Sequence, residues 1–494
     1  MGLFNKKSKN KITNYEGALS WQLEPELELY SLVCTSILSE TFYEKKDDRL
    51  NRLRELIKKV TPEFIAKLSI YAREQMYLRT LPLILVVELA KIHHGDSLVS
   101  KLTTRVIQRV DELTEILAYY KIANNLTKLN KLSKQLQKGI RNAFYKFDEY
   151  QFAKYDRDNE IKLRDCLFLV HPKPRNESQK KLFEKIINRK LETPYTWEVE
   201  LTKAGQLGKE KKQVWEELID SNKVSYMALL RNLRNIIKSN MSLKHFKKVI
   251  GTIKNPEKVK QSKQFPFRFL AAYKEVEKLT TGLEPLIMEA LNEAIIHSID
   301  NIEGFDIDTK VLIACDVSGS MQVNISKKSK IQLYDIGLVL GMLLKYKCKN
   351  IVTGIFGDNW EVIQLPQKNI LDNVNELYKI EGKVGYSTNG WKVIKWTLEN
   401  KKEFDKIMFF TDCQLWDSSG NNEKIQDYWV KYHQKYPKSK LYLFDLQGYG
   451  TTPLRLKENN VYLISGWSDK IFTVLESIEK GNDILKFIKE NINL

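Results

Sequence analysis

A short apolar run, residues 311–315, ends abruptly in three oxygen-bearing side chains at alternate positions, Asp316, Ser318 and Ser320. The run predicts a buried strand, and alternate residues at the end of a strand project close together. Hard cations such as Mg²⁺ prefer oxygen ligands in a near-octahedral set and usually keep several waters. One carboxylate and two hydroxyls therefore indicate a divalent metal site with an open coordination position. Alone the motif is only a modest signal, because these residue types are common.

Two later segments supply the rest of such a site. Residues 406–410 form a second apolar run that is followed by Asp412, and the glycine-bounded loop 385–390 carries the hydroxyl of Thr388. Ligands of open α/β sheets bind outside the carboxyl ends of the strands. The expected ligands of one Mg²⁺, or of Mn²⁺ in its place, are Asp316, Ser318, Ser320, Thr388 and Asp412. The alternative, that Asp316 and its serines only cap the following helix, is compatible with ligation.

The hydrophobic periodicity changes near residue 305. From about residue 20 to 298 the chain predicts successive helices of roughly twelve to eighteen residues. Residues 61–73 are typical, with Thr61 as N-cap and Pro62 at the first helical position. The irregular helix pairs without a strict repeat are typical of a HEAT-type α-solenoid. We expect residues 1–304 to form this helical domain.

Residues 305–494 follow a different rhythm, in which short apolar runs alternate with helical stretches. Such alternation implies right-handed crossovers and a mostly parallel, doubly wound sheet. Strands are expected near residues 310–315, 351–356, 406–410, 441–445 and 461–464. Helices are expected near residues 333–346, 387–399, 423–435 and 470–490.

The net charge of +18 is distributed unevenly. Residues 301–494 carry 26 Lys and Arg against 24 Asp and Glu, whereas residues 1–300 carry 54 against 38. A basic half next to a nearly neutral half indicates nucleic acid or another anionic surface as a partner of the helical region. A lysine-rich surface that reflects only an A/T-biased genome is the alternative.

The cysteines and the hydropathy bear on the compartment. The five cysteines are scattered, which predicts neither a disulfide framework nor a zinc site. The sequence has no apolar stretch of the roughly eighteen residues that a bilayer span needs, and its start lacks the apolar core of a secretory signal. We therefore expect a cytoplasmic protein that does not act at a membrane, and a monomer.

The candidate metal motif resembles the metal-ion-dependent adhesion site of the von Willebrand factor A domain. The resemblance implies that Ser318, Ser320 and Thr388 bind the metal directly, whereas Asp316 and Asp412 act largely through water. It also implies that the open position accepts a carboxylate from a protein partner.

The chain as a whole resembles the TROVE family of Ro RNA-binding proteins and their bacterial relatives. The specific stretches are residues 162–174 and 227–235, and residues 73–79 and 196–198 add weaker support. The resemblance implies helices closed into a ring. The outer surface of this ring would bind small structured noncoding (Y-like) RNA, and its hole would admit single-stranded ends of misfolded RNA. An exoribonuclease or another protein would then bind through the A domain.

A basic stretch surrounds the first of these hallmarks. Arg and Lys supply the phosphate contacts that dominate affinity for nucleic acid, and His can stack or hydrogen-bond. Two prolines at 172 and 174 restrict the directions in which the neighbouring side chains project. The candidate RNA-binding residues are Lys154, Arg157, Arg164, His171, Lys173 and Arg175.

Comparison with the family pattern and the helical context qualify this prediction. Lys154 and His171 match RNA-contacting positions of the Ro proteins. Asp158 departs from the family, whose members carry a basic residue there, and this puts tight binding of Y RNA in doubt. Arg231 and Arg234 lie in a strongly apolar helix, so we expect buried partners of carboxylates rather than RNA ligands at these two positions.

The preferred function is a non-enzymatic RNA-binding protein that acts in ribonucleoprotein assembly and in RNA quality control or decay. The chain has no phosphate-binding Gly-rich loop with its Lys, and no Ser/His/Asp or Cys/His order that suggests nucleophilic catalysis. Nucleases usually place several carboxylates around their metals, whereas hydroxyls dominate this site. The alternative is a metal-dependent protein-binding adaptor whose basic surface is incidental.

Overall fold

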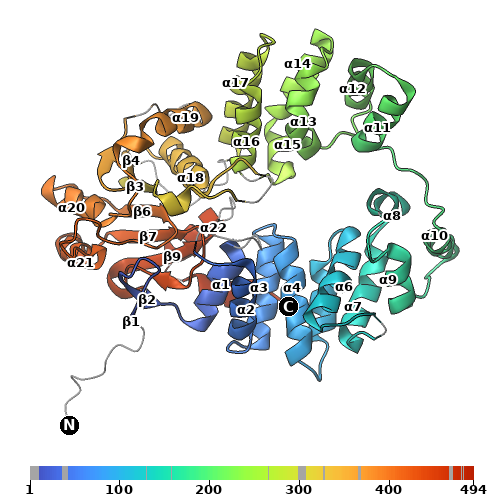
Figure 1. The fold of residues 1–494 in the computed structure, drawn as a ribbon, viewed down its shortest axis with the longest axis horizontal. Helices are drawn as coiled ribbons and strands as arrows, with labels where there is room; N and C mark the ends of the chain where they lie inside the picture. The colour runs from blue at the N-terminus through green and yellow to red at the C-terminus, as the bar shows by residue number, and fades with distance from the viewer. Residues whose placement is uncertain are drawn as a thin grey trace. The chain divides into compact units, whose positions relative to one another are not determined.

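The computed structural model spans the 494 residues of the chain (Figure 1). It describes all of them except 1–10, 36–42, 130, 157, 265, 299–307, 326–328, 365, 367, 368, 467–470, 480 and 482. Packing divides the chain into two compact units. One contains residues 1–51 and 219–484, and the other contains residues 52–218 and 485–494. The predicted domain boundary, at residues 304 and 305, lies outside the described residues.

The unit formed by residues 52–218 and 485–494 is helical. Its helices, of which the first and the last cross the unit's limits, are α2 (Lys46–Ile57), α3 (Pro62–Glu74), α4 (Thr80–Ile92), α5 (Leu98–Val106), α6 (Asp111–Ala123), α7 (Lys134–Ala143), η2 (Phe144–Lys146), α8 (Glu149–Tyr155), α9 (Leu163–Val170), α10 (Glu177–Ile187), α11 (Trp197–Leu207), α12 (Lys211–Asp220) and α23 (Ile484–Asn491). Helix α3 begins as the sequence predicts, because the Thr61 hydroxyl accepts the N–H of Phe64 at 3.3 Å. Helices α3, α4, α5 and α6 pack on one another as successive layers.

A buried charge network joins these layers. The guanidinium of Arg73 donates to Glu112 at 2.8 Å, and Arg79 pairs with Asp111 at 3.0 Å and with Glu112 at 3.3 Å. Glu112 is fully buried and Arg73 nearly so, so Arg73 without Glu112 would be an uncompensated charge in a poorly solvated place. Arg73 and Arg79 of the family-like stretch 73–79 thus both bind carboxylates inside the helical unit.

The other unit contains a six-stranded sheet in the order β5-β4-β3-β6-β7-β9. Its strands are β3 (Val311–Asp316), β4 (Ile351–Phe356), β5 (Trp360–Val362), β6 (Lys406–Thr411), β7 (Lys440–Asp445) and β9 (Val461–Ser465). All neighbours are parallel except β5, which pairs antiparallel with β4 at the edge. The prediction of a mostly parallel sheet is confirmed, and each predicted strand lies within one residue of its observed bounds at either end.

Helices accompany this sheet. They are η3 (Gly319–Met321), α18 (Leu333–Lys347), α19 (Ile370–Ile380), η4 (Glu381–Lys383), α20 (Trp391–Glu399), α21 (Ile425–Lys435), η5 (Glu458–Asn460) and α22 (Ile471–Glu479). Helix α18 packs closely against β3, β4 and β6. Glycine at position 341 permits this approach, because a Cβ there would lie only 3.0 Å from the side chain of Ile313. The single helix predicted over 470–490 is instead two helices, α22 and α23, and Gly481 with φ +87° lies between them.

The same unit includes the N-terminal segment, which the sequence prediction placed in the helical domain. Strands β1 (Lys11–Thr13) and β2 (Leu19–Gln22) form a hairpin, and β2 pairs with β8 (Thr451–Thr452). Helix α1 (Pro25–Thr35) packs against β9, where the Tyr30 hydroxyl accepts the N–H of Ser465 at 3.0 Å. The hairpin therefore lies beside the loops at the carboxyl ends of the strands.

Helices α13 to α17 complete this unit. They are α13 (Tyr226–Lys238), α14 (Leu243–Ile253), α15 (Pro256–Ser262), α16 (Pro266–Val276) and α17 (Glu284–His297). Helix α16 packs on α18, and the Lys274 ammonium pairs with buried Asp335 at 3.1 Å. The Asn292 side chain accepts the N–H of Leu371 at 3.0 Å, which fixes α17 against α19. None of the described helices of either unit is long and apolar enough to cross a bilayer.

Candidate functional site

The candidate metal site lies at the carboxyl ends of two neighbouring strands. Asp316 is the last residue of β3, and Asp412 directly follows β6, which pairs with β3 in parallel register. Both carboxylates are buried, with exposed fractions of 1% and 0%. The parallel register thus brings together two acidic groups that the sequence separates by almost a hundred positions.

The hydrogen bonds of the two carboxylates are unequal. Asp316 accepts the N–H of Ser318 at 3.0 Å and the Thr411 hydroxyl at 2.7 Å, one at each oxygen. Asp412 accepts the N–H of Gln414 at 3.0 Å on Oδ1, whereas its buried Oδ2 has no hydrogen-bond partner among the described residues. A buried charged oxygen without a partner is costly. Its position suits a cation or a hydrogen-bond donor.

The pKa values of the two carboxylates also favour a cation at this position. Burial raises the pKa of Asp316 to about 6, although hydrogen bonds from Ser318 and Thr411 oppose the shift. Burial together with the charge of Asp316 raises the pKa of Asp412 to about 8. Two such carboxylates disfavour each other's charged form, and a divalent cation between them would remove the conflict.

The hydroxyl groups complete the donor set in part. Ser318 Oγ and Ser320 Oγ are buried and lie 3.3 Å apart. The loop that carries Thr388 contacts them through the N–H of Gly319, which donates to the carbonyl of Tyr386 at 3.1 Å. The Thr388 hydroxyl itself donates to the Gln414 carbonyl at 3.1 Å and accepts the N–H of Trp416 at 3.2 Å.

The structure therefore brings Asp316, Ser318, Ser320 and Asp412 together, with Thr388 on an adjoining loop and its hydroxyl bonded to backbone. Carboxylate and hydroxyl oxygens fit a hard cation such as Mg²⁺ or Mn²⁺. No cluster of three or more His, Cys, Asp or Glu suited to a metal occurs among the described residues. The fit thus depends on the two serines as well as on the two carboxylates.

Two groups at this site were missed by the sequence prediction. Thr411 orients Asp316 by its hydrogen bond, and its place between the β6 run and Asp412 was a signal that could have identified it. Gln414 binds Asp412 through its N–H and reaches Thr451 Oγ1 with its side chain at 3.1 Å. Nothing in the local sequence marks Gln414.

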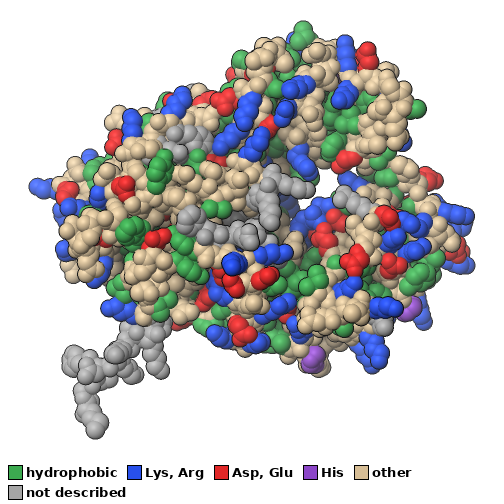
Figure 2. Space-filling model, viewed as in Figure 1, with side chains coloured by type: hydrophobic (Ala, Val, Ile, Leu, Met, Phe, Trp, Pro, Cys, Tyr) green, Lys and Arg blue, Asp and Glu red, His purple; other side chains and the backbone are tan. Residues whose placement is uncertain are grey.

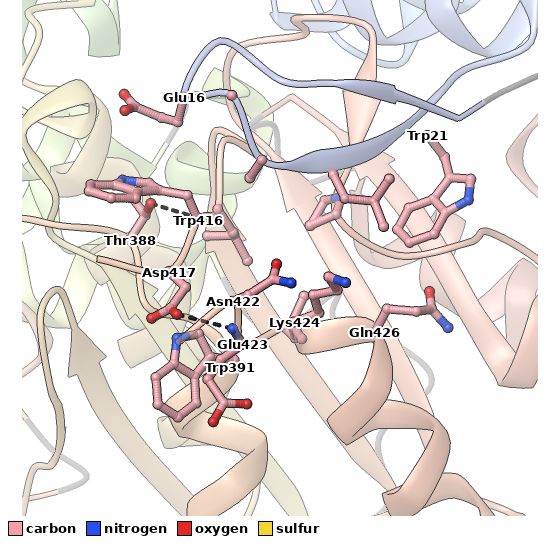
Figure 3. A pocket seen from close by; sticks show the side chains of 16 residues that line it. Glu16, Trp21, Thr388, Trp391, Trp416, Asp417, Asn422, Glu423, Lys424 and Gln426 are labelled. Atoms are coloured by element: carbon pink, nitrogen blue, oxygen red, sulfur yellow. Dashed lines mark hydrogen bonds between the residues drawn. The ribbon is translucent and has the colours of Figure 1, made fainter. Parts of the chain in front are cut away.

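A cavity of about 250 Å³ lies beside the Thr388 loop (Figure 3). Thr388, Trp391 and Trp416 line it together with Glu16 of the N-terminal hairpin. The Asp417 carboxylate accepts the N–H of Glu423 at 3.0 Å, which orders one wall. The cavity combines the indole surfaces of two tryptophans with acidic side chains.

Three of the predicted RNA-binding residues, His171, Lys173 and Arg175, lie at the end of α9 and just after it. His171 ends this helix in the left-handed conformation, with φ +48°. The last carbonyls of α9 are capped from α7, because Gln137 donates to Leu169 O and Arg141 donates to Val170 O, each at 2.7 Å. The backbone is thus fixed, while the His171 side chain is exposed.

Tyr145 brings two of the predicted cations together. Its hydroxyl donates to the carbonyl of Lys173 at 2.9 Å, and the Arg175 guanidinium lies over its ring, 3.8 Å from the centroid. Both Lys173 and Arg175 are exposed. Cation–π contact orients the guanidinium without neutralising it, so its charge stays available to a phosphate.

The remaining predicted RNA-binding residues differ in their exposure and in their neighbours. Lys154 is exposed on α8 near the rings of Tyr150 and Tyr155, at 6.0 and 5.7 Å. Arg164 is half-buried and lies 3.7 Å from the carboxylate of its neighbour Asp165. Arg157 lies outside the described residues.

Asp158, the departure from the family pattern, is exposed and paired with two cations. It lies 2.8 Å from the Lys162 ammonium and 3.1 Å from Arg189, and the hydrogen bond from Lys162 lowers the pKa of Asp158. Its charge offsets part of the basic character of this surface.

Helix α13 corrects one prediction. Arg231 and Arg234 are exposed rather than buried, because the helical period places them opposite the buried face formed by Leu229, Leu233 and Ile237. Arg234 pairs with Glu275 at 3.0 Å. The expectation of burial was therefore wrong for both residues, whereas the expected carboxylate partner is present for Arg234.

Both arginines line a cleft of about 640 Å³ with Arg268, Lys274 and Lys330. Lys330 shares Glu275 with Arg234. Arg231 and Arg268 have no carboxylate partner in the described part of the chain, and burial together with the charge of Arg231 lowers the pKa of Arg268. On the face seen in Figure 2, Lys and Arg side chains gather over helices α13 to α17.

Comparison with known proteins gives consistent matches. The model of the TROVE domain matches residues 29–189 and 188–330, and the model of the Ro60 vWA domain matches residues 310–478. Telomerase protein component 1 of Rattus norvegicus is 24% identical over 344 residues, and that of Mus musculus is 25% identical over 348. Each alignment covers 53% of this chain but only 13% of the relative. The crystal structure of the Deinococcus radiodurans Ro (RSR) protein superposes with a TM-score of 0.61 at 15% identity, over 92% of this chain and 100% of the other.

Proposed function

Because this chain belongs to the TROVE family and carries a Ro60-type von Willebrand A domain, we propose that it is an RNA-binding protein without a catalytic step of its own. It binds a small structured (Y-like) RNA and the single-stranded ends of misfolded RNA. Its role is in ribonucleoprotein assembly and in RNA quality control or decay. Family membership supports RNA binding in general. The kind of RNA and the role in quality control or decay are our proposal.

The observation that carries the proposal is the exposed basic turn at the end of α9. His171, Lys173 and Arg175 are held on a capped, left-handed backbone, with Tyr145 beneath the guanidinium. Aromatic and guanidinium planes accept unstacked bases, while the cations contact phosphates. A rigid platform of this kind loses little conformational freedom when RNA binds.

The basic cleft beside α13 offers a second contact. Arg231 and Arg268 both line it and interact electrostatically, and neither has a carboxylate partner among the described residues. Like charges held together in a partly desolvated cleft disfavour each other, and a phosphate group would relieve both. The cleft is therefore a candidate path for a single-stranded segment.

The metal site supports a second role in protein binding. Asp316, Ser318, Ser320 and Asp412 would hold one Mg²⁺ or Mn²⁺, and Thr388 would join them if its hydroxyl left the Gln414 carbonyl. The bound ion would supply a Lewis-acidic position for a partner's carboxylate. This role is favoured by Oδ2 of Asp412, which has no hydrogen-bond partner in the described part of the chain. An exoribonuclease is one class of protein that such a site could recruit.

Binding of RNA to the full-length chain tests the main proposal. The RNAs are a small hairpin-rich RNA and a duplex with a single-stranded 3′ tail, measured from low to high salt. The His171→Ala/Lys173→Ala variant should bind more weakly, by about 1–3 kcal/mol if one stacking contact is lost. The Lys211→Ala/Lys212→Ala variant removes two exposed charges from α12 and serves as the matched control.

Three outcomes are informative. Weaker binding by the α9-turn variant alone supports the proposal. Equal weakening by both variants would mean that only net charge matters. No binding of either RNA by the unaltered chain at low salt would favour the adaptor, in which the basic surface is incidental.

A further inference from the structure

The N-terminal hairpin holds a third carboxylate next to the candidate metal site. Glu16 lies in the turn between β1 and β2, and Asn14 shapes this turn by accepting the N–H groups of Glu16 at 3.1 Å and Ala18 at 2.8 Å. Gly17 has φ +76°, which suits glycine in such a turn. Local hydrogen bonds of the turn therefore fix the backbone position of Glu16.

The turn is bonded directly to the loop that follows Asp412. The Asn14 side chain donates to the carbonyl of Leu415, and the N–H of Tyr15 donates to the side chain of Gln414, each at 3.0 Å. Gln414 is the residue whose N–H holds Asp412. Figure 3 shows Glu16 on the hairpin side of the cavity that Thr388 and Trp416 line.

Tyr43 connects Glu16 to the metal site. Its hydroxyl donates to the Glu16 carboxylate and hydrogen-bonds with Ser320, and it lies close enough to Asp412 for electrostatic interaction. The ring packs against those of Tyr15 and Tyr449, with centroids 5.2 and 5.4 Å away, and these two rings also contact each other at 5.3 Å. Nearby, buried Arg49 pairs with Glu44 at 3.2 Å and donates to the carbonyl of Gln447 at 2.7 Å.

A continuous chain of hydrogen bonds thus leads from Ser320 through Tyr43 to Glu16. Outer groups that hydrogen-bond to metal ligands orient those ligands and adjust their affinity for the ion. A carboxylate behind a tyrosine hydroxyl also adds negative potential at the place where a cation would bind. The two effects act in the same direction, toward tighter binding of a divalent ion.

We propose that Glu16, acting through Tyr43, is a positioning residue of the metal site and raises its affinity for Mg²⁺ or Mn²⁺. The inference rests on the metal site of the proposed function. It extends that site to a segment that lies 300 residues upstream of Asp316. The N-terminal hairpin is then part of the metal site as well as of the fold.

Calorimetric titration of the metal-free full-length chain with Mn²⁺ tests the proposal. Glu16→Gln and Tyr43→Phe should each weaken Mn²⁺ binding by about 10-fold, the lower end of the usual range for lost outer-shell partners. Because both changes break one chain, the double variant should be about as weak as either single variant rather than 100-fold weaker. Thermal unfolding of each variant checks that the hairpin remains folded.

The matched control is Glu24→Gln, which removes the same charge from an exposed position of the same segment. Mn²⁺ affinity unchanged in Glu16→Gln, or multiplicative effects in the double variant, would overturn the inference while the metal site stands. If the unaltered chain takes up no Mn²⁺, the metal site and the inference both fail, and RNA binding is judged separately. Equal losses in Glu24→Gln and Glu16→Gln would reduce the role of Glu16 to net charge and would also overturn it.

Discussion

The hydroxyl of Ser31 in α1 donates to Oδ2 of Asp445 at the end of β7, at 2.5 Å, although the two residues lie 414 positions apart. Asp445 also accepts the N–H groups of Gln447 at 3.0 Å and Gly448 at 2.7 Å on its other oxygen. Its Oδ2 therefore depends on the N-terminal helix. The carboxyl end of β7 thus uses an acidic residue to bind another part of the chain, whereas Oδ2 of Asp412 after β6 has no hydrogen-bond partner among the described residues.

Ser31→Ala should loosen α1 from the sheet. The change leaves a buried carboxylate oxygen without its donor, which costs about 1–3 kcal/mol. Hydrogen exchange of the α1 amides should become faster, and the melting temperature should fall. Ser178→Ala, at an exposed position of α10, is the control. If exchange in α1 stayed at its original rate, Ser31 would not anchor this segment.

Asp316→Ala should abolish saturable uptake of Mg²⁺ and Mn²⁺, because it removes one of the two carboxylates at the site. Asp412→Ala should have the same effect. Thr388→Ala should weaken uptake less, because the Thr388 hydroxyl is already bonded to the Gln414 carbonyl. Calorimetry on the metal-free chain measures all three.

RNA affinity provides the control for the metal variants. Asp316→Ala should bind RNA as tightly as the unaltered chain, because Asp316 and the α9 turn belong to different compact units. Uptake of metal by Asp316→Ala equal to that of the unaltered chain would refute the site. Loss of RNA binding in the same variant would mean that the site and RNA binding are linked.

Glu88→Gln should destabilise the helical unit in a pH-dependent way. Burial opposes ionisation of Glu88, but hydrogen bonds from Tyr119 at 2.6 Å, Arg54 at 3.0 Å and a pair with Lys91 at 3.1 Å outweigh it and lower the pKa of Glu88. A lowered folded-state pKa means that the ionised group stabilises the fold above the ordinary value of 4.5. This contribution is lost as the pH falls through the folded-state pKa.

The melting temperatures of the unaltered chain and of Glu88→Gln are compared at pH 7 and near pH 3.5. The loss of unfolding free energy in Glu88→Gln should be largest at pH 7, about 1–3 kcal/mol for a buried hydrogen-bonded charge. The corresponding difference in melting temperature should shrink at the lower pH. Glu55→Gln, which removes an exposed pair with Lys58, should cost little at either pH. A penalty for Glu88→Gln that was the same at both pH values would contradict the assignment.

The metal site shows how much a local pattern can predict. Apolar runs followed by Asp316 and Asp412 identified both strand ends, because a buried parallel strand needs continuous apolar residues and its carboxyl end is where polar groups gather. The hydroxyl of Thr388 was harder to place, since two hydrogen bonds to the 414–416 loop decide its direction. Such bonds depend on three-dimensional neighbours that no motif encodes.

The N-terminal segment shows the limit of such reasoning. Strand β2 pairs with β8 through Trp21 and Thr452, and neither three-residue β1 nor two-residue β8 is long enough to give a periodic signal. Glu16 and Tyr43 reach the metal site only because this pairing forms. Arg231 was misjudged for a different reason: an apolar helix was taken as buried all round, whereas its hydrophobic residues occupy one face only.

Arg231→Ala/Arg268→Ala should weaken the binding of RNA with a single-stranded tail and should reduce its salt dependence. Losing two phosphate contacts lowers the slope of log affinity against log salt by roughly 1.4 for single-stranded RNA. Lys211→Ala/Lys212→Ala, with the same loss of net charge, should change the slope little.

Stability separates this role from a structural one. The two guanidinium groups interact electrostatically and have no carboxylate partner among the described residues, so their removal should leave the melting temperature unchanged or raise it. A lower melting temperature with an unaltered salt slope would show that the cleft serves the fold and not RNA.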